Sequence, residues 1–129
     1  MTAVVLDASA LLALLKDEPG ASKVAEVLAT SRISAVNVAE VVSHFIHAGM
    51  PPSQVDAMLR PLPVTIVEAD ADLATGAGRL RAVTAQAGLS LGDRFCLALA
   101  LRDGVAAWTA DRQWRTVAEV LGLEIVFVR

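Results

Sequence analysis

The residues Ala3-Val4-Val5-Leu6-Asp7 are the stretch from which the fold can be argued most directly. Four consecutive apolar residues, two of them β-branched, are typical of a strand that is buried on both faces, as in a parallel sheet. Asp7 stands where this strand is expected to end. In α/β proteins the crevice beyond the carboxyl ends of parallel strands is where functional groups collect.

The rest of the chain alternates short strand-like runs with helical patterns, separated by turn signals such as Pro19-Gly20 and Pro51-Pro52. The predicted strands are 3–6, 32–34, 64–67, 105–109 and 124–128. The predicted helices are 9–16, 21–29, 36–46, 53–59, 70–86, 94–102 and 112–121. This alternation predicts an α/β fold, a three-layer sandwich with a mainly parallel central sheet flanked by helices. With 129 residues, we expect a single domain over 1–129.

Composition narrows the classes of function. The chain is 55% apolar and 19% charged, which predicts a compact globular protein. Its net charge of -3 argues against binding nucleic acid by bulk electrostatics, so any such contact must use local charge. Of the 11 basic residues only Lys16 and Lys23 are lysines. The others are arginines, which can bind phosphate in a bidentate manner.

The apolar run 8–15 is the only early segment that resembles a leader or a membrane anchor. It follows Asp7, lacks a basic leader and is far too short to span a bilayer. The single cysteine, Cys96, lies in an apolar stretch and is interpreted as a core residue. We therefore expect a cytoplasmic protein that does not associate with a membrane.

Three aspartates, Asp7, Asp93 and Asp111, fall at predicted boundaries between a strand or turn and a helix. Asp is also a favoured helix N-cap, so each has an alternative role as a capping residue. Taken one at a time, none of the three identifies a site.

Glu40 lies on the helical face that also carries Asn37, His44 and His47. The simplest interpretation of this face is a solvated polar stripe. An alternative is a zinc site built from Glu40 and the two histidines, although the sequence offers no recognisable segment for a further ligand.

The joint pattern of the acids is more informative than any one of them. Four segments together resemble PIN-domain ribonucleases, and within that family a VapC-type toxin: 6–12 (LDASALL), 36–41 (VNVAEV), 89–100 (LSLGDRFCLALA) and 108–114 (WTADRQW). The resemblance implies a PIN fold and endonucleolytic cleavage of RNA with one or two Mg²⁺ or Mn²⁺ ions. It further implies inhibition by a VapB-like antitoxin and assembly as a homodimer.

The resemblance also assigns roles to residues of this chain. By position, the catalytic and metal-binding acids are Asp7, Glu40, Asp93 and Asp111, with Ser9 and Thr109 as supporting polar groups. Arg94 and Arg112 stand beside two of the acids, where each could bind phosphate or form a structural ion pair. Many family members carry a further acid near the fourth position, but here Asp111 is followed by Arg112-Gln113-Trp114, so no fifth metal-binding acid is expected.

The chemistry of the metal agrees with this set of residues. Mg²⁺ prefers oxygen ligands, and several carboxylates held about 4 Å apart repel by roughly 4 kcal/mol per pair at an effective dielectric constant of about 20. A divalent cation relieves that repulsion and can activate a water for attack on a phosphodiester.

Three rival functions use similar residues. A receiver-type phosphoacceptor domain usually needs an adjacent pair of acids after the first strand and a late lysine, but this chain has Asp7 alone and no lysine after Lys23. A haloacid-dehalogenase-like phosphatase needs a second Asp where Ser9 stands. A catalytically inactive PIN-like protein or RNA-binding module would keep the fold without cleaving RNA.

Overall fold

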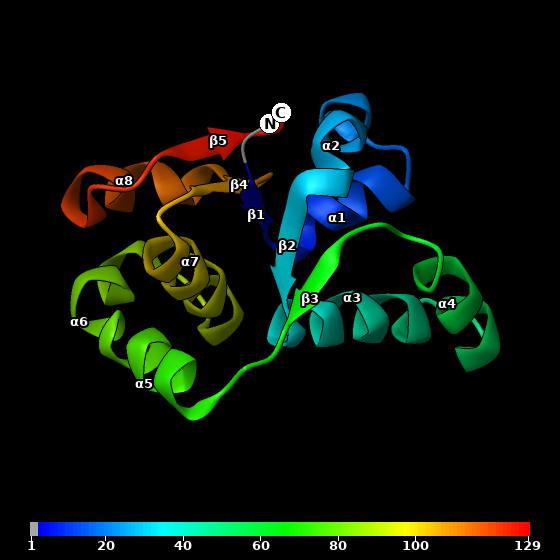
Figure 1. Ribbon diagram of the computed structural model, residues 1–129, viewed down its shortest axis with the longest axis horizontal. Helices are drawn as coiled ribbons and strands as arrows, with labels where there is room; N and C mark the ends of the chain where they lie inside the picture. Colours follow the sequence, from blue (N-terminus) through cyan, green and yellow to red (C-terminus); the bar gives the residue numbers. More distant parts are fainter. Residues whose placement is uncertain (1–2) are drawn as a thin grey trace.

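The computed structural model describes residues 3–129 and has a five-stranded sheet at its centre (Figure 1). The strands run in the order β3-β2-β1-β4-β5, and every neighbouring pair is parallel. Their bounds are β1 Val4–Leu6, β2 Ser31–Ser34, β3 Thr65–Val67, β4 Ala106–Thr109 and β5 Ile125–Phe127. The predicted α/β sandwich is confirmed, and its sheet is wholly parallel.

Helices cover both faces of the sheet (Figure 1). Their bounds are α1 Ala8–Leu15, α2 Ala21–Val27, α3 Ala35–His47, α4 Pro52–Leu59, α5 Ala71–Arg79, α6 Arg81–Thr84, α7 Leu91–Asp103 and α8 Arg115–Leu121. Short 3-10 turns follow or precede three of them, at Leu28–Thr30, Ala85–Ala87 and Arg112–Trp114. Within residues 3–129 no helix combines the length and the apolar character needed to cross a membrane.

The two faces of the sheet each have their own apolar core. Side chains alternate along β1, so Val4 and Leu6 pack with α1, α2 and α3, whereas Val5 packs with α5, α7 and α8. Cys96 lies fully buried in the second core, as the sequence predicts. The central strand is therefore buried on both sides, which is why its sequence is continuously apolar.

β1 is also the point at which the order of the strands reverses. From β1 the chain builds outward to β2 and β3 on one side, and later to β4 and β5 on the other. Leu6 lies opposite Ile33 of β2 and Trp108 of β4. This switch point leaves a crevice beyond the carboxyl end of β1 and brings the residues after β1 and β4 side by side.

Three predicted helices differ from those observed, and one of them, predicted over 112–121, begins as the 3-10 turn Arg112–Trp114 before α8. The helix predicted over 70–86 is broken after α5, because Gly76 and Gly78 weaken it and the chain turns near Leu80. The helix predicted to begin at Arg94 begins three residues earlier, as α7. Ser90 is its N-cap and forms a capping box with Asp93.

Candidate active site

Asp7 is the residue on which the site is built. It follows β1 directly, is 3% exposed, and caps α1 by accepting a 2.8 Å hydrogen bond from the backbone N–H of Ala10. Capping and a possible catalytic role are thus compatible in one side chain. The hydroxyl of Ser9 donates to both carboxylate oxygens of Asp7, at 2.8 and 2.9 Å, and the hydroxyl of Thr109 donates to Oδ2 at 2.6 Å.

These hydroxyls also tie the end of β4 to the end of β1. Ser9 Oγ accepts from the backbone N–H of Ala110 at 2.9 Å, and Thr109 Oγ1 accepts from that of Asp111 at 3.0 Å. Burial raises the pKa of Asp7 to about 6, although the hydrogen bonds from Thr109, Ala10 and Ser9 each lower it. The nearby charge of Asp93 also raises it. Asp7 is therefore a buried carboxyl group whose charged form gains from a cation.

Asp93 lies in the first turn of α7 and not before it. Its Oδ2 accepts a 2.8 Å bond from the backbone N–H of Ser90, whose hydroxyl in turn accepts from the backbone N–H of Asp93 at 3.2 Å. Burial raises the pKa of Asp93, and the charge of Asp111 adds to the rise, while the Ser90 hydrogen bonds and Arg94 act against it. Asp93 is half-buried and close enough to Asp7 and Asp111 to feel both charges.

Asp111 is the N-cap of the 3-10 turn Arg112–Trp114, where its Oδ1 accepts from the backbone N–H of Gln113 at 2.9 Å. The predicted capping role is therefore present. Because only Oδ1 is used in the cap, and because its charge acts on Asp93, Asp111 also belongs to the edge of the acidic group.

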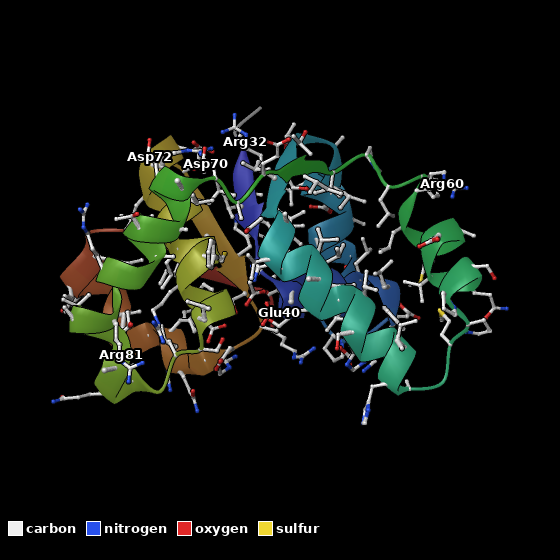
Figure 2. The ribbon with its side chains drawn as sticks, turned by 90° about the horizontal axis from the view of Figure 1, so that it is seen from below. Arg32, Glu40, Arg60, Asp70, Asp72 and Arg81 are labelled. Atoms are coloured by element: carbon white, nitrogen blue, oxygen red, sulfur yellow. The ribbon has the colours of Figure 1, made fainter. Side chains whose placement is uncertain are left out.

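Glu40 lies on α3 at the place where this helix meets α7 (Figure 2). Its Oε1 accepts a 2.7 Å hydrogen bond from the amide of Asn37, and the same amide donates to the carbonyl oxygen of Gly92 at 3.0 Å. The polar-stripe interpretation is wrong for Asn37, which is 1% exposed because α7 crosses this part of α3. The sequence does not identify Asn37 or Gly92 as functional. The i, i+3 spacing of Asn37 and Glu40 permits their hydrogen bond but does not predict the burial of Asn37, and nothing local points to Gly92.

Cys96 lies one turn along α7 from Asp93, and the charges of three of the acids act on its thiol. Burial raises the pKa of its thiol well above the usual value, and the charges of Asp7, Asp93 and Glu40 each raise it further. The acids are neighbours, but their carboxylates are not gathered into one cluster. Within residues 3–129, no three His, Cys, Asp or Glu side chains lie close enough together to hold a metal ion. The finding covers both the four acids and the alternative zinc ligands Glu40, His44 and His47.

The two candidate phosphate-binding arginines differ in accessibility. Arg94 is 9% exposed, and its guanidinium donates only a long 3.5 Å bond to the carbonyl oxygen of Leu89, leaving Nε without an acceptor. Arg112 is exposed beside Asp111. Among residues 3–129 neither forms an ion pair. Arg32 and Arg102 form ion pairs with Asp103. Arg32 lies well apart from Glu40 (Figure 2).

Comparison with known protein families now adds to this geometry. The family model described as PIN domain matches residues 4–120, which is most of the chain. The chain belongs to the PIN domain family. The matched range contains Asp7, Glu40, Asp93 and Asp111, and the sheet order with its switch point at β1 is the frame that holds them.

Solved structures with the same fold include several toxin–antitoxin proteins. The DNA-bound VapBC of Salmonella typhimurium is similar with a TM-score of 0.76 and 18% identity, covering 100% of each chain. VapBC-5 of Mycobacterium tuberculosis gives a TM-score of 0.67 and 22% identity over 98% of this chain and 99% of that chain. VapC20 of the same organism, a Sarcin-Ricin loop cleaving toxin, gives a TM-score of 0.71 and 16% identity. The match covers 88% of this chain and 94% of that chain. No curated protein matches the sequence significantly.

Proposed function

We propose that this PIN domain is a metal-dependent endoribonuclease that hydrolyses RNA phosphodiester bonds, and that it is the toxin component of a toxin–antitoxin system. The observation that carries the proposal is the setting of Asp7. Asp7 is a buried carboxyl group with a pKa of about 6, at the switch point of a parallel sheet and next to other acids. Burying such a group costs folding free energy, and carboxyl groups in this setting are concentrated at functional sites. Membership of the PIN family and the likeness to VapC20 support this activity.

The chemistry of the donors fits a hard divalent cation, Mg²⁺ or Mn²⁺, as one or two ions. The candidate ligands Asp7 and Asp93 offer only oxygen, and both have raised pKa values through burial, so each gains from a positive charge. We assign Asp7 and Asp93 as the main ligands, with Glu40 and Asp111 completing the set directly or through water. The metal supplies activation of a water and stabilisation of the developing charge on the phosphate.

The other residues of the site act on these acids or on the substrate. Ser9 and Thr109 hold the Asp7 carboxylate in one orientation, so that it does not have to be ordered when a cation binds. The exposure of Arg112 beside Asp111 supports a contact with a phosphate of the RNA, whereas Arg94 is buried. We therefore assign Arg112 to RNA binding ahead of Arg94.

The test is cleavage of a mixed RNA substrate by the purified chain with Mg²⁺, with Mn²⁺ and with EDTA. We expect cleavage with either ion, none with EDTA, and none for Asp7→Asn or Asp93→Asn. Full activity of both variants would sink the assignment of the site. Binding of RNA with no cleavage under any condition would instead identify an inactive PIN-like binding module.

The partner of this PIN domain is proposed from its structural neighbours. The neighbours from Salmonella typhimurium and Mycobacterium tuberculosis are VapBC proteins of toxin–antitoxin systems. By analogy we propose a VapB-like antitoxin, a homodimer and a cytoplasmic location for this chain. Co-expression with the product of an adjacent small gene tests the first of these. Relief of growth arrest together with co-purification supports the partner, and toxicity that persists beside a soluble candidate argues against it.

A further inference from the structure

The side-chain amide of Asn37 joins two helices at the edge of the acidic group. It is 1% exposed and donates to Glu40 Oε1 on its own helix, α3, and to the Gly92 carbonyl oxygen in the first turn of α7. Both partners can only accept hydrogen bonds, so the NH₂ group must face them and the orientation of the amide is fixed. The amide oxygen Oδ1 is consequently turned the other way, where it is buried and has no donor among the described residues.

Gly92 completes the contact from the side of α7. A Cβ atom built on Gly92 would overlap Oε1, Oε2 and Cδ of Glu40, so the carboxylate occupies the space that any other residue would fill. Gly92 has no positive φ, so backbone conformation does not demand a glycine here. Glycine inside a helix normally weakens it relative to alanine. With the Glu40 carboxylate in its observed position, only glycine leaves room for it at position 92.

These contacts act on a side chain that would otherwise be free. Glu40 is exposed and has three rotatable bonds, so an unrestrained carboxylate would sample many positions. The Asn37 amide and the bare surface of Gly92 together hold it against the start of α7, one residue from Asp93. The buried Asn37 amide makes two hydrogen bonds but leaves its oxygen unpaired, which costs free energy of folding. Apolar side chains would stabilise the packing of the two helices without that cost.

We propose that Asn37 and Gly92 are positioning residues that fix the Glu40 carboxylate for cation binding, an inference that rests on the proposed metal-dependent function. Asn37 acts by hydrogen bonding and Gly92 by leaving space, and neither contacts the RNA. The amide is specific to this role. An aspartate at position 37 would place a third acceptor against Glu40 and the Gly92 carbonyl oxygen, and a serine would be too short to reach both.

Mn²⁺ affinity, measured by electron paramagnetic resonance on the intact chain, tests this proposal. Unfolding of the metal-free protein, measured alongside, shows whether each variant still folds. We expect Asn37→Ser and Gly92→Ala each to weaken Mn²⁺ binding roughly 10–100-fold, the range typical of groups that orient a metal ligand. Gly78→Ala is the matched control, because it is also inside a helix and a Cβ there meets nothing within 4 Å. It should bind Mn²⁺ as the wild type does.

A double-mutant cycle with Glu40→Gln separates positioning from general structural damage. If Asn37 acts only through Glu40, then Asn37→Ser combined with Glu40→Gln should bind Mn²⁺ as weakly as Glu40→Gln alone. If the decreases in Mn²⁺ affinity caused by the two substitutions instead multiply in the double variant, the proposal is overturned. Wild-type affinity in both Asn37→Ser and Gly92→Ala also overturns it. Should Asn37→Ser fail to fold, Gly92→Ala decides alone, because alanine favours the helix and Glu40 can swing away at its flexible end.

The same measurement separates the inference from the function beneath it. A wild-type chain that binds no Mn²⁺ overturns the proposed metal-dependent function and the positioning role with it. A wild type that binds Mn²⁺, with variants that bind equally well, overturns the positioning role alone.

Discussion

The Thr109 hydroxyl donates a 2.6 Å hydrogen bond to Asp7 Oδ2, across 102 residues of sequence. Both residues are almost fully buried, and each follows or ends a strand of the same pair, β1 and β4. The same hydroxyl oxygen accepts from the backbone N–H of Asp111. One side chain thus connects two of the four acids of the site.

Replacing Thr109 by valine keeps its shape and removes this donor. Because the Thr109 hydrogen bond lowers the pKa of Asp7, we expect that pKa to rise above about 6. A hydrogen bond to a charged group contributes about 1.5–3 kcal/mol, so the loss of stability should be greater at pH 8, where Asp7 is ionised, than at pH 5. Urea unfolding at both pH values measures this. Thr75→Val, in an exposed helical position, is the control, and a loss independent of pH would contradict the prediction.

Asp7→Asn should increase the stability of the metal-free protein at neutral and higher pH. The carboxyl has a pKa of 3.8 in the unfolded chain and about 6 in the native state, so between these values the native state binds more protons. Stability from this group therefore falls as the pH rises through that window. The gain of Asp7→Asn at pH 8 should be up to about 3 kcal/mol and should shrink towards pH 4. A gain that is constant with pH would show that ionisation of Asp7 is not its cause.

Arg94→Met tests whether the enclosed guanidinium has a structural partner. Its Nε lacks an acceptor among the described residues, and its remaining bond to Leu89 is long. Removing a buried charge that has no ion pair is expected to leave stability unchanged or to raise it. Thermal unfolding gives the answer. A decrease of several kcal/mol would mean that Arg94 makes a strong interaction in solution.

Arg112→Ala should affect RNA binding and leave folding intact. The side chain is exposed and forms no ion pair within residues 3–129, so its removal costs little stability. If Arg112 contacts a phosphate equally in the ground state and the transition state, KM rises while kcat stays the same. Arg94→Met, measured beside it, should show no such rise in KM. Equal effects of the two variants would contradict the assignment of Arg112 ahead of Arg94.

Gly20→Ala should destabilise the fold through a specific steric clash. A Cβ on Gly20 would lie 2.5 Å from the carbonyl oxygen of Val128, and φ at Gly20 is +99°. Gly49→Ala is a close control, because φ there is +98° and nothing lies within 4 Å. Both variants carry the strain of a positive φ, at about 1 kcal/mol or more. The stability that Gly20→Ala loses beyond Gly49→Ala, seen as a lower midpoint of urea unfolding, measures the clash with Val128. Equal midpoints would rule out the clash.

Much of the fold follows from local patterns in the sequence. The run Val4-Val5-Leu6 favours a strand buried on both faces, as β1 is, and the Asp that follows it marks the carboxyl edge of the sheet. The start of α7 was predicted less well, because Asp93 looks like an N-cap when Ser90 is the true cap and Asp93 its partner in the capping box. Local propensity does not choose between two capping residues three positions apart.

The site was predicted only in part, for a reason that lies in tertiary packing. The four acids stand at strand ends or on a helix face, positions that sequence periodicity can locate. The burial of Asn37 arises because α7 crosses α3, and the overlap of Glu40 with the missing Cβ of Gly92 joins positions 52 residues apart. Such contacts have no local signature. The proximity of Asp7, Asp93 and Asp111 likewise depends on β4 pairing with β1.

The placement of β4 beside β1 also orders events during synthesis. Asp7 and Glu40 are synthesised well before Thr109 and Asp111, which belong to a strand and turn that must pair with the earlier strand β1. A partly made chain therefore lacks half of its acidic group and the hydroxyl that orients Asp7. In a chain proposed to cut RNA, the acidic group is complete only once Asp111 has been synthesised and β4 has paired with β1.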